Sequence, residues 1–176
     1  GKNFPLEYLK LKKNKKIYSN YIIYAFSHSS LEQNYFEEEI EILNKISQYT
    51  QNISKKIKII ARLYPYDQNK NNLQFKNLKN VRIQNYGKKI KTRKNNNFVY
   101  EYNLLYKKNF INNSICVINV FTTYGIESVL LNKPTIFYSL KKERNILQYL
   151  NCIDFKLKFM PHFKIIKNKI ITPKNN

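Results

Sequence analysis

The segment YIIYAFSHSS, residues 21–30, sets the fold class, because an apolar run of β-forming residues passes directly into a polar helix start. Residues 21–26 predict a buried strand. Ser29 and Glu32 match the Ser-x-x-Glu capping box, which predicts a helix that continues to about Tyr49. One stripe of that helix is apolar, formed by Leu31, Tyr35, Phe36, Ile40, Leu43 and Ile46. The opposite face carries Glu37, Glu38, Glu39 and Glu41, which we interpret as a solvated surface.

The same step from strand to helix recurs along the chain. Further strands are predicted at residues 56–63 (KIKIIARL), 81–83 (VRI), 114–120 (SICVINV) and 135–138 (TIFY). Helices are predicted over residues 101–110, 126–131 and 143–150, a charged loop over residues 88–97 and a turn at residues 132–134. Because the strands are apolar on both faces, we predict an α/β fold, with a parallel sheet and helices on both of its faces. Ligands of such sheets bind at the carboxyl ends of the strands, here residues 27–30, 62–67 and 121–128.

The length of 176 residues suits a single domain with a sizeable core. We assign residues 1–18 to a linker or inter-domain segment, residues 19–160 to the α/β domain and residues 161–176 to an irregular tail. No apolar run reaches the ~18 residues of a membrane-spanning helix. The two cysteines are too few for a disulfide scaffold or a four-ligand zinc site.

The net charge of +21, from 32 Lys and Arg against 11 Asp and Glu, favours nucleic acid or an anionic membrane surface as a partner. The basic residues are nearly all Lys, and Asn, Ile and Tyr are also abundant, which is typical of a coding bias spread over every surface. We therefore treat most of this charge as background that helps the chain near an anionic membrane. Nucleic acid is not the partner that we expect.

Several catalytic and nucleotide-binding signatures are missing from the sequence. Three glycines cannot form G-x-G-x-x-G or a Walker loop, and no metal-binding motif is present. His28 and His162 are the only histidines, and the segment around His28 lacks the G-x-S-x-G elbow that presents a nucleophile. His28 is thus a weak candidate for catalysis, and the catalytic residues stay unknown.

The segment FTTYGIES, residues 121–128, is the strongest candidate site. A buried strand leads into Thr122 and Thr123, and Gly125 allows a group to approach the backbone closely. The helix start that follows offers N–H donors and a positive dipole end to a phosphate, and Glu127 beside it suits ribose hydroxyls. The structural alternative is equally strong, since Thr is a common N-cap and an early Glu complements the helix dipole.

Arg62 stands at the end of an apolar strand in a chain that nearly always uses Lys. Guanidinium binds phosphate in a bidentate manner that ammonium cannot achieve, which favours an anion-binding role. The alternative is a surface Arg that pairs with Asp67.

Two of these segments resemble a known family. RLYPYD (62–67) resembles the Arg-x-(His/Tyr)-Pro-x-Asp segment of bacterial cell-surface polysaccharide transferases. FTTYGIESVLLNKPTIFY (121–138) resembles their segment of a strand, Thr/Ser, a small residue, Glu, a helix, Lys/Arg-Pro and a strand. Over residues 20–140 the chain is similar to the C-terminal, nucleotide-binding half of GT-B glycosyltransferases, in the style of CDP-glycerol glycerophosphotransferases and capsule-polysaccharide transferases. Gly125-Ile126 replaces the paired Ser of the glycerophosphotransferases, and Tyr64 replaces the commoner His.

The resemblance implies roles for individual residues. The donor diphosphate would be bound by Ser27, His28, Arg62, Thr122, Thr123 and Gly125. The ribose would be bound by Glu127. The substrate would be a nucleotide-activated sugar or polyol, with no further cofactor and no obligatory metal. The acceptor would be a cell-surface polysaccharide or lipid, and a missing N-terminal domain would complete the enzyme. The resemblance implies a cytoplasmic location, peripheral on the inner membrane face.

Two other functions remain open. A basic nucleic-acid-binding domain accounts for the charge and for the many Tyr and Phe residues, which could stack on bases. A UDP-sugar 2-epimerase-like domain shares the expected sheet architecture, although no further carboxylates are convincingly placed for the sugar.

Overall fold

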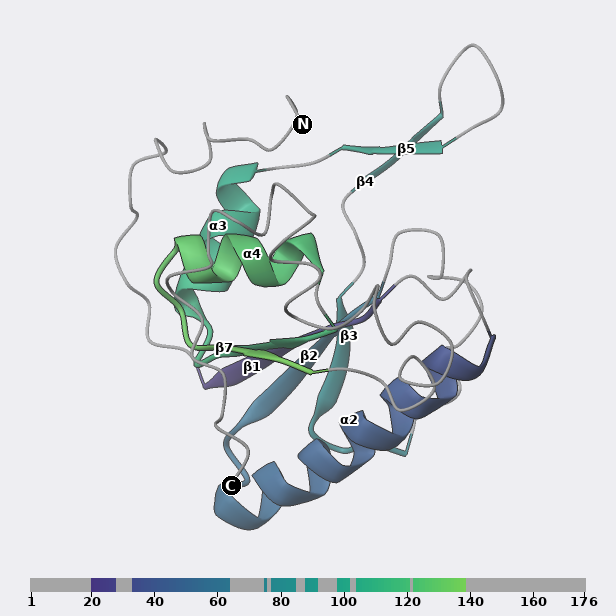
Figure 1. The fold of residues 1–176 in the computed structure, drawn as a ribbon, viewed down its shortest axis with the longest axis vertical. Coiled ribbons are helices and arrows are strands. Elements are labelled where there is room, and N and C mark those ends of the chain that lie inside the picture. Colours follow the sequence, from purple (N-terminus) through teal and green to yellow (C-terminus); the bar gives the residue numbers. More distant parts are fainter. Residues whose placement is uncertain are drawn as a thin grey trace.

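The computed structural model describes residues 20–27, 33–63, 75, 77–84, 88–91, 98–101, 104–120 and 122–138. Five strands form one parallel sheet in the order β3-β2-β1-β6-β7. Their bounds are β1 Tyr21–Ala25, β2 Lys58–Arg62, β3 Val81–Gln84, β6 Val117–Asn119 and β7 Thr135–Phe137. Helix α2 (Gln33–Ile53) covers one face, and α3 (Leu104–Asn113) and α4 (Thr123–Leu130) lie on the other (Figure 1). The predicted α/β fold, Rossmann-like with helices on both faces of a parallel sheet, is confirmed.

Strand β1 is the centre of the sheet and is buried on both faces. Ile22, Tyr24 and Phe26 pack with the residues of α2, whereas Ile23 and Ala25 pack with those of α3 and α4. Successive side chains of a strand point to opposite faces, so one short apolar run supplies both halves of the core. This explains why residues 21–26 read as continuously apolar rather than alternating.

Helix α2 packs on the sheet through the apolar stripe that the sequence predicts. Phe36, Ile40 and Leu43 are buried, and Ile46 is partly buried against them. The helix is longer than expected and ends at Ile53 rather than near Tyr49. Its last two turns are joined to the residue before β3 by a buried polar network of Ser47, Thr50, Gln51 and Asn80.

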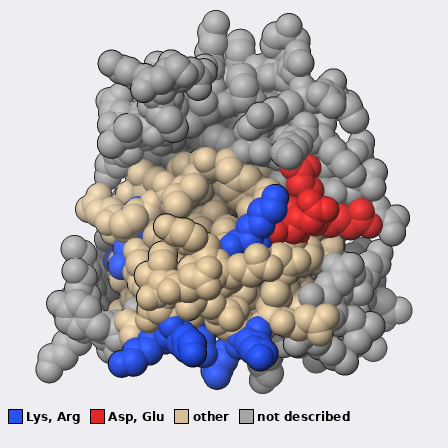
Figure 2. Space-filling model, turned by 90° about the horizontal axis from the view of Figure 1, so that it is seen from below, with Lys and Arg blue, Asp and Glu red and all other residues tan. Residues whose placement is uncertain are grey.

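The acidic residues of α2 do not all belong to a solvated surface. Glu37 and Glu41 are exposed as predicted, but Glu39 is fully buried, with 0% of its surface exposed. Figure 2 shows acidic side chains gathered in one patch on the α2 side. The prediction fails for Glu39 because its position on the helix turns the carboxylate toward the end of β1, where Ser27 hydrogen-bonds to it.

Residues 88–97 are not simply a charged loop. Strand β4 (Lys88–Lys91) pairs antiparallel with β5 (Phe98–Glu101) in a two-stranded ribbon that stands apart from the main sheet (Figure 1). Glu101 therefore belongs to a strand, and the helix predicted from it begins only at Leu104. In the register of this ribbon, Lys88 lies opposite Glu101. The charged composition of residues 88–91 does not by itself reveal that they pair as a strand.

The turn predicted after α4 is present, and Asn132 adopts a positive φ of 56°, which Asn tolerates better than most residues. The predicted linker 1–18, the helix at 143–150 and the tail 161–176 lie outside the described residues. Within the part of the chain that the structure describes, no helix has both the length and the apolar character needed to span a bilayer.

A matched pair of substitutions on α2 tests its packing. Leu43→Ala should lower the free energy of unfolding by about 2–5 kcal/mol, because Leu43 is fully buried in the core. Ile53→Ala, at a position 60% exposed on the same helix, should change it by less than about 1 kcal/mol. Urea unfolding measures both values, and equal losses would contradict the observed packing.

Candidate functional site

The carboxyl ends of the five strands meet in one row of the sheet. The register sets Gln84, Arg62, Ala25, Asn119 and Phe137 side by side, one from each strand. The order of the strands places the topological switch point between β1 and β6, which is where ligands of open α/β sheets bind. The row therefore contains both Arg62 and the approach to α4 that the sequence singles out.

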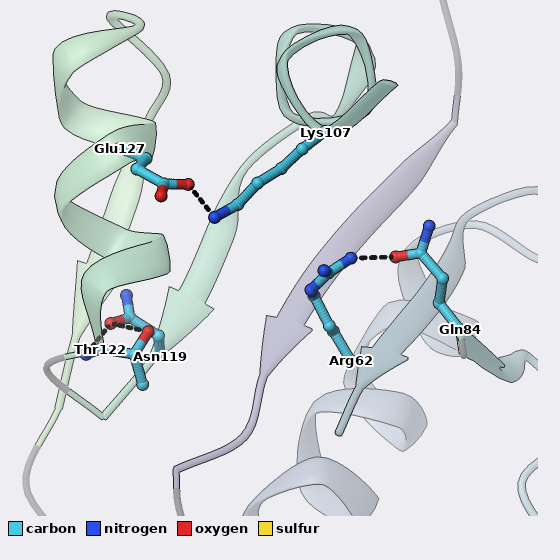
Figure 3. Close-up of polar contacts among 6 residues, drawn as sticks. All are labelled: Arg62, Gln84, Lys107, Asn119, Thr122 and Glu127. Carbon is cyan, nitrogen blue, oxygen red and sulfur yellow. Dashed lines mark hydrogen bonds and ion pairs between the residues drawn. The ribbon is translucent and has the colours of Figure 1, made fainter. Parts of the chain in front are cut away.

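Arg62 is buried, with 7% of its surface exposed, and is not a simple surface arginine. One guanidinium nitrogen donates to Oε1 of Gln84 at 3.0 Å, as Figure 3 shows. Its guanidinium carbon also lies 4.8 Å from the centre of the Tyr124 ring. The alternative partner, Asp67, lies outside the described residues.

Tyr124 links Arg62 to α3. Tyr124 packs in the same core cluster as Ala25, the central residue of the row. Nζ of Lys107, from α3, lies 4.7 Å from the centre of the Tyr124 ring. Cation–π contacts of this kind are strongest where the cation has lost water, and Lys107 is itself buried. The Tyr124 ring thus contacts two cations, Arg62 and Lys107, near the switch point.

The start of α4 is fixed by Asn119 rather than by a threonine hydroxyl. Thr122 occupies the N-cap position with an extended backbone, but its side chain makes no capping hydrogen bond. Its N–H and Oγ1 instead donate to Oδ1 of Asn119, at 2.9 and 3.3 Å (Figure 3). The simple N-cap alternative therefore does not describe the Thr122 side chain. Thr123, the first helical residue, is exposed.

Helix α4 begins at Thr123, three residues earlier than predicted, so Gly125 lies inside the helix. A Cβ on Gly125 would stand 2.4 Å from Oδ1 of Asn119 and 2.6 Å from the Phe137 ring. The close approach expected at this glycine is thus made by two side chains of the sheet.

Glu127 is in the second turn of α4, not the first, and forms a buried ion pair with Lys107 (Figure 3). Burial raises the pKa of Glu127, an effect that Lys107 partly offsets. Burial likewise lowers the pKa of Lys107, from 10.5 to about 8, against the opposing pull of Glu127. Desolvation thus outweighs the attraction in both partners. The earlier helix start explains why Glu127 does not complement the dipole in the first turn.

Ser27, at the end of β1, is engaged by Glu39. The backbone N–H of Ser27 donates to Oε1 of Glu39 at 2.9 Å, and its hydroxyl donates to Oε2 at 2.8 Å. Ser27, which the sequence predicts to line the diphosphate, therefore binds a carboxylate of the chain through both of these donors. His28, the weak catalytic candidate, lies outside the described residues.

The structure brings Arg62 and Glu127 close enough for Arg62 to influence the pKa of Glu127. Sequence reasoning missed Lys107, Asn119, Tyr124 and Glu39. Asn119 carried a usable signal, because a polar residue ended an otherwise apolar strand. Glu39 and Lys107 carried none, because Glu39 lies among three other glutamates of its helix and Lys107 stands next to another lysine.

Among the described residues, no group of three or more His, Cys, Asp or Glu side chains could hold a metal ion. No protein-family model, curated protein or solved structure matches the chain. The functional assignment accordingly rests on the geometry of these residues and on the resemblance of the two sequence segments.

Gly125→Ala tests why a glycine is needed in α4. Alanine normally stabilises a helix interior by about 1 kcal/mol relative to glycine. Here the added methyl would collide with Asn119 and Phe137, so we expect a loss of about 1–3 kcal/mol in the free energy of unfolding. Thr123→Ala, at the exposed start of the same helix, is the control and should change it by less than about 0.5 kcal/mol. A stabilised Gly125→Ala variant would contradict the packing.

A double-mutant cycle tests the buried ion pair. Lys107→Met leaves Glu127 without its cation and should lower the free energy of unfolding by about 3–5 kcal/mol, whereas adding Glu127→Gln should recover much of the loss. Because the folded-state pKa of Lys107 lies below 10.5, the unfolded state binds more protons between about pH 8 and 10.5. Stability should therefore rise with pH in that range, and less so in the double variant. Additive losses would contradict the coupling.

Proposed function

We propose that the chain is the donor-nucleotide-binding domain of a transferase that moves a sugar or a polyol phosphate from a nucleotide donor to a cell-surface polysaccharide or lipid acceptor. The strand order supports this proposal, because it creates a topological switch point between β1 and β6, and open α/β sheets commonly bind ligands at such a point. The resemblance of residues 62–67 and 121–138 to polysaccharide transferases supports the transferase class. An N-terminal domain would supply the acceptor site and the general base.

The observation that carries the proposal is that Arg62 is buried beside the first turn of α4. The side chain of Thr122, the N-cap residue of that helix, makes no capping hydrogen bond. Arg62 lies two strands from Asn119, in the row that leads to the start of α4. The Tyr124 ring, from the first turn of α4, contacts its guanidinium. A guanidinium and a helix start supply complementary donors and positive potential to a phosphate group.

Each residue has a distinct task in this proposal. Thr123 and the backbone of the first turn of α4 would hold the phosphate, and Arg62 would offset its charge as the nucleotide departs. Glu127 would meet the ribose hydroxyls, with its carboxylate oriented by Lys107. Because these groups stabilise the departing nucleotide directly, the proposed transfer assigns no role to a metal.

Among the residues that the structure describes, the exposed cations give no specific support to the nucleic-acid alternative. Lys45, Lys55, Lys56, Lys79 and Arg82 are the exposed basic residues whose side chains the structure describes. They are spread over α2, the turn before β2, and β3 with the residues just before it. A nucleic-acid surface would concentrate basic residues on one stripe or face.

Calorimetric titration with CDP, UDP, GDP and CMP tests the proposal. At least one nucleotide should bind saturably, and Arg62→Ala should weaken its binding about tenfold or more, because a charge-assisted contact is lost. Arg82→Ala, which removes an exposed arginine from the neighbouring strand, is the matched control and should bind like the original chain. Circular dichroism checks that both variants are folded.

The absence of saturable binding by every nucleotide would overturn the proposal. Equal affinity of the Arg62→Ala and Arg82→Ala variants would also overturn it. Arg62→Lys keeps the positive charge but removes the bidentate geometry, and we expect it to bind less tightly than the original chain.

A further inference from the structure

A carboxylate of the chain itself, that of Glu39, lies at the end of β1. The carboxylate of Glu39 accepts the backbone N–H and the hydroxyl of Ser27, one on each oxygen. A backbone N–H and a hydroxyl can both donate to a phosphate oxygen, and ligands of parallel sheets bind at the carboxyl ends of the strands. Glu39 therefore uses the donors that a second phosphate at the switch point would need.

Glu39 is held firmly in this position. Its side chain is fully buried, so the carboxylate relies on these hydrogen bonds in place of water. Its backbone carbonyl accepts a hydrogen bond from the Tyr24 hydroxyl at 3.0 Å, and that hydroxyl is also bonded to the hydroxyl of Tyr138. The turn of α2 that carries Glu39 is thus tied to β1 and to the end of β7.

The neighbouring strand end differs from that of β1. Strands β1 and β6 are adjacent, with Ala25 opposite Asn119, so their ends lie about 4.8 Å apart in the sheet. The Thr122 side chain does not cap the start of α4, which follows β6. The helix dipole favours a negative group at the start of α4. A second negative group that reached the end of β1 would be repelled by the carboxylate of Glu39.

We propose that Glu39 sets the specificity of the site by closing the β1 end to phosphate. The preferred ligand is then a nucleotide with a single phosphate, as in a donor activated by a nucleoside monophosphate, rather than a nucleoside diphosphate. This inference rests on the proposed nucleotide-binding function and narrows the class of donor.

Calorimetry with matched pairs of nucleotides, CMP with CDP, UMP with UDP and GMP with GDP, tests the inference. The original chain should bind the monophosphate of a pair at least as tightly as the diphosphate. Glu39→Gln keeps an acceptor for Ser27 but removes the charge, and it should shift the ratio about tenfold toward the diphosphate. Glu37→Gln removes an equal charge from an exposed position of α2 and should leave the ratio unchanged.

The outcomes separate the two proposals. A diphosphate bound ten or more times more tightly than its monophosphate by the original chain would overturn the inference without any variant. Equal ratios for Glu39→Gln and Glu37→Gln would also overturn it while leaving the Arg62-dependent nucleotide site in place. If none of the six nucleotides binds, the proposed function fails and this inference fails with it.

Discussion

The close approach of α4 to the carboxyl edge of the sheet is the constraint on which the other features depend. It requires a glycine at residue 125, because the side chains of Asn119 and Phe137 occupy the space that a Cβ would need. At this separation Asn119 can bind Thr122 and set the start of the helix. Tyr124 is then buried over the row of strand ends, where Arg62 and Lys107 contact its ring.

Charged groups are buried beside this contact although burial is unfavourable for each of them. Two cations, Arg62 and Lys107, and the carboxylate of Glu127 come from three different elements. Arg62 lowers the pKa of both Lys107 and Glu127, and these two also shift each other's pKa. A purely structural core would gain as much from apolar side chains of similar volume. Buried, mutually perturbed charges at the ligand-binding edge of a sheet are typical of functional sites.

The two central strand ends have opposite electrostatic character. The end of β1 carries the buried carboxylate of Glu39, whereas β6 leads into the positive end of the α4 dipole. The same helical position that removes Glu39 from the surface therefore shapes the candidate site. Helix α2, which otherwise covers the sheet, also places a carboxylate at the end of β1, beside the switch point.

The sequence by itself determined the α/β class, the positions of the five parallel strands and the place of Arg62 at a strand end, because short runs rich in apolar, β-forming residues are visible locally. It could not determine the β4–β5 ribbon, whose pairing joins the lysine-rich residues Lys88–Lys91 to Phe98–Glu101, or the earlier start of α4. Nor could it distinguish Glu39 from Glu37, or Lys107 from the exposed lysines. Only the tertiary structure decided these points, because the burial of a charged side chain depends on partners from distant segments: Ser27 for Glu39, and Glu127 for Lys107.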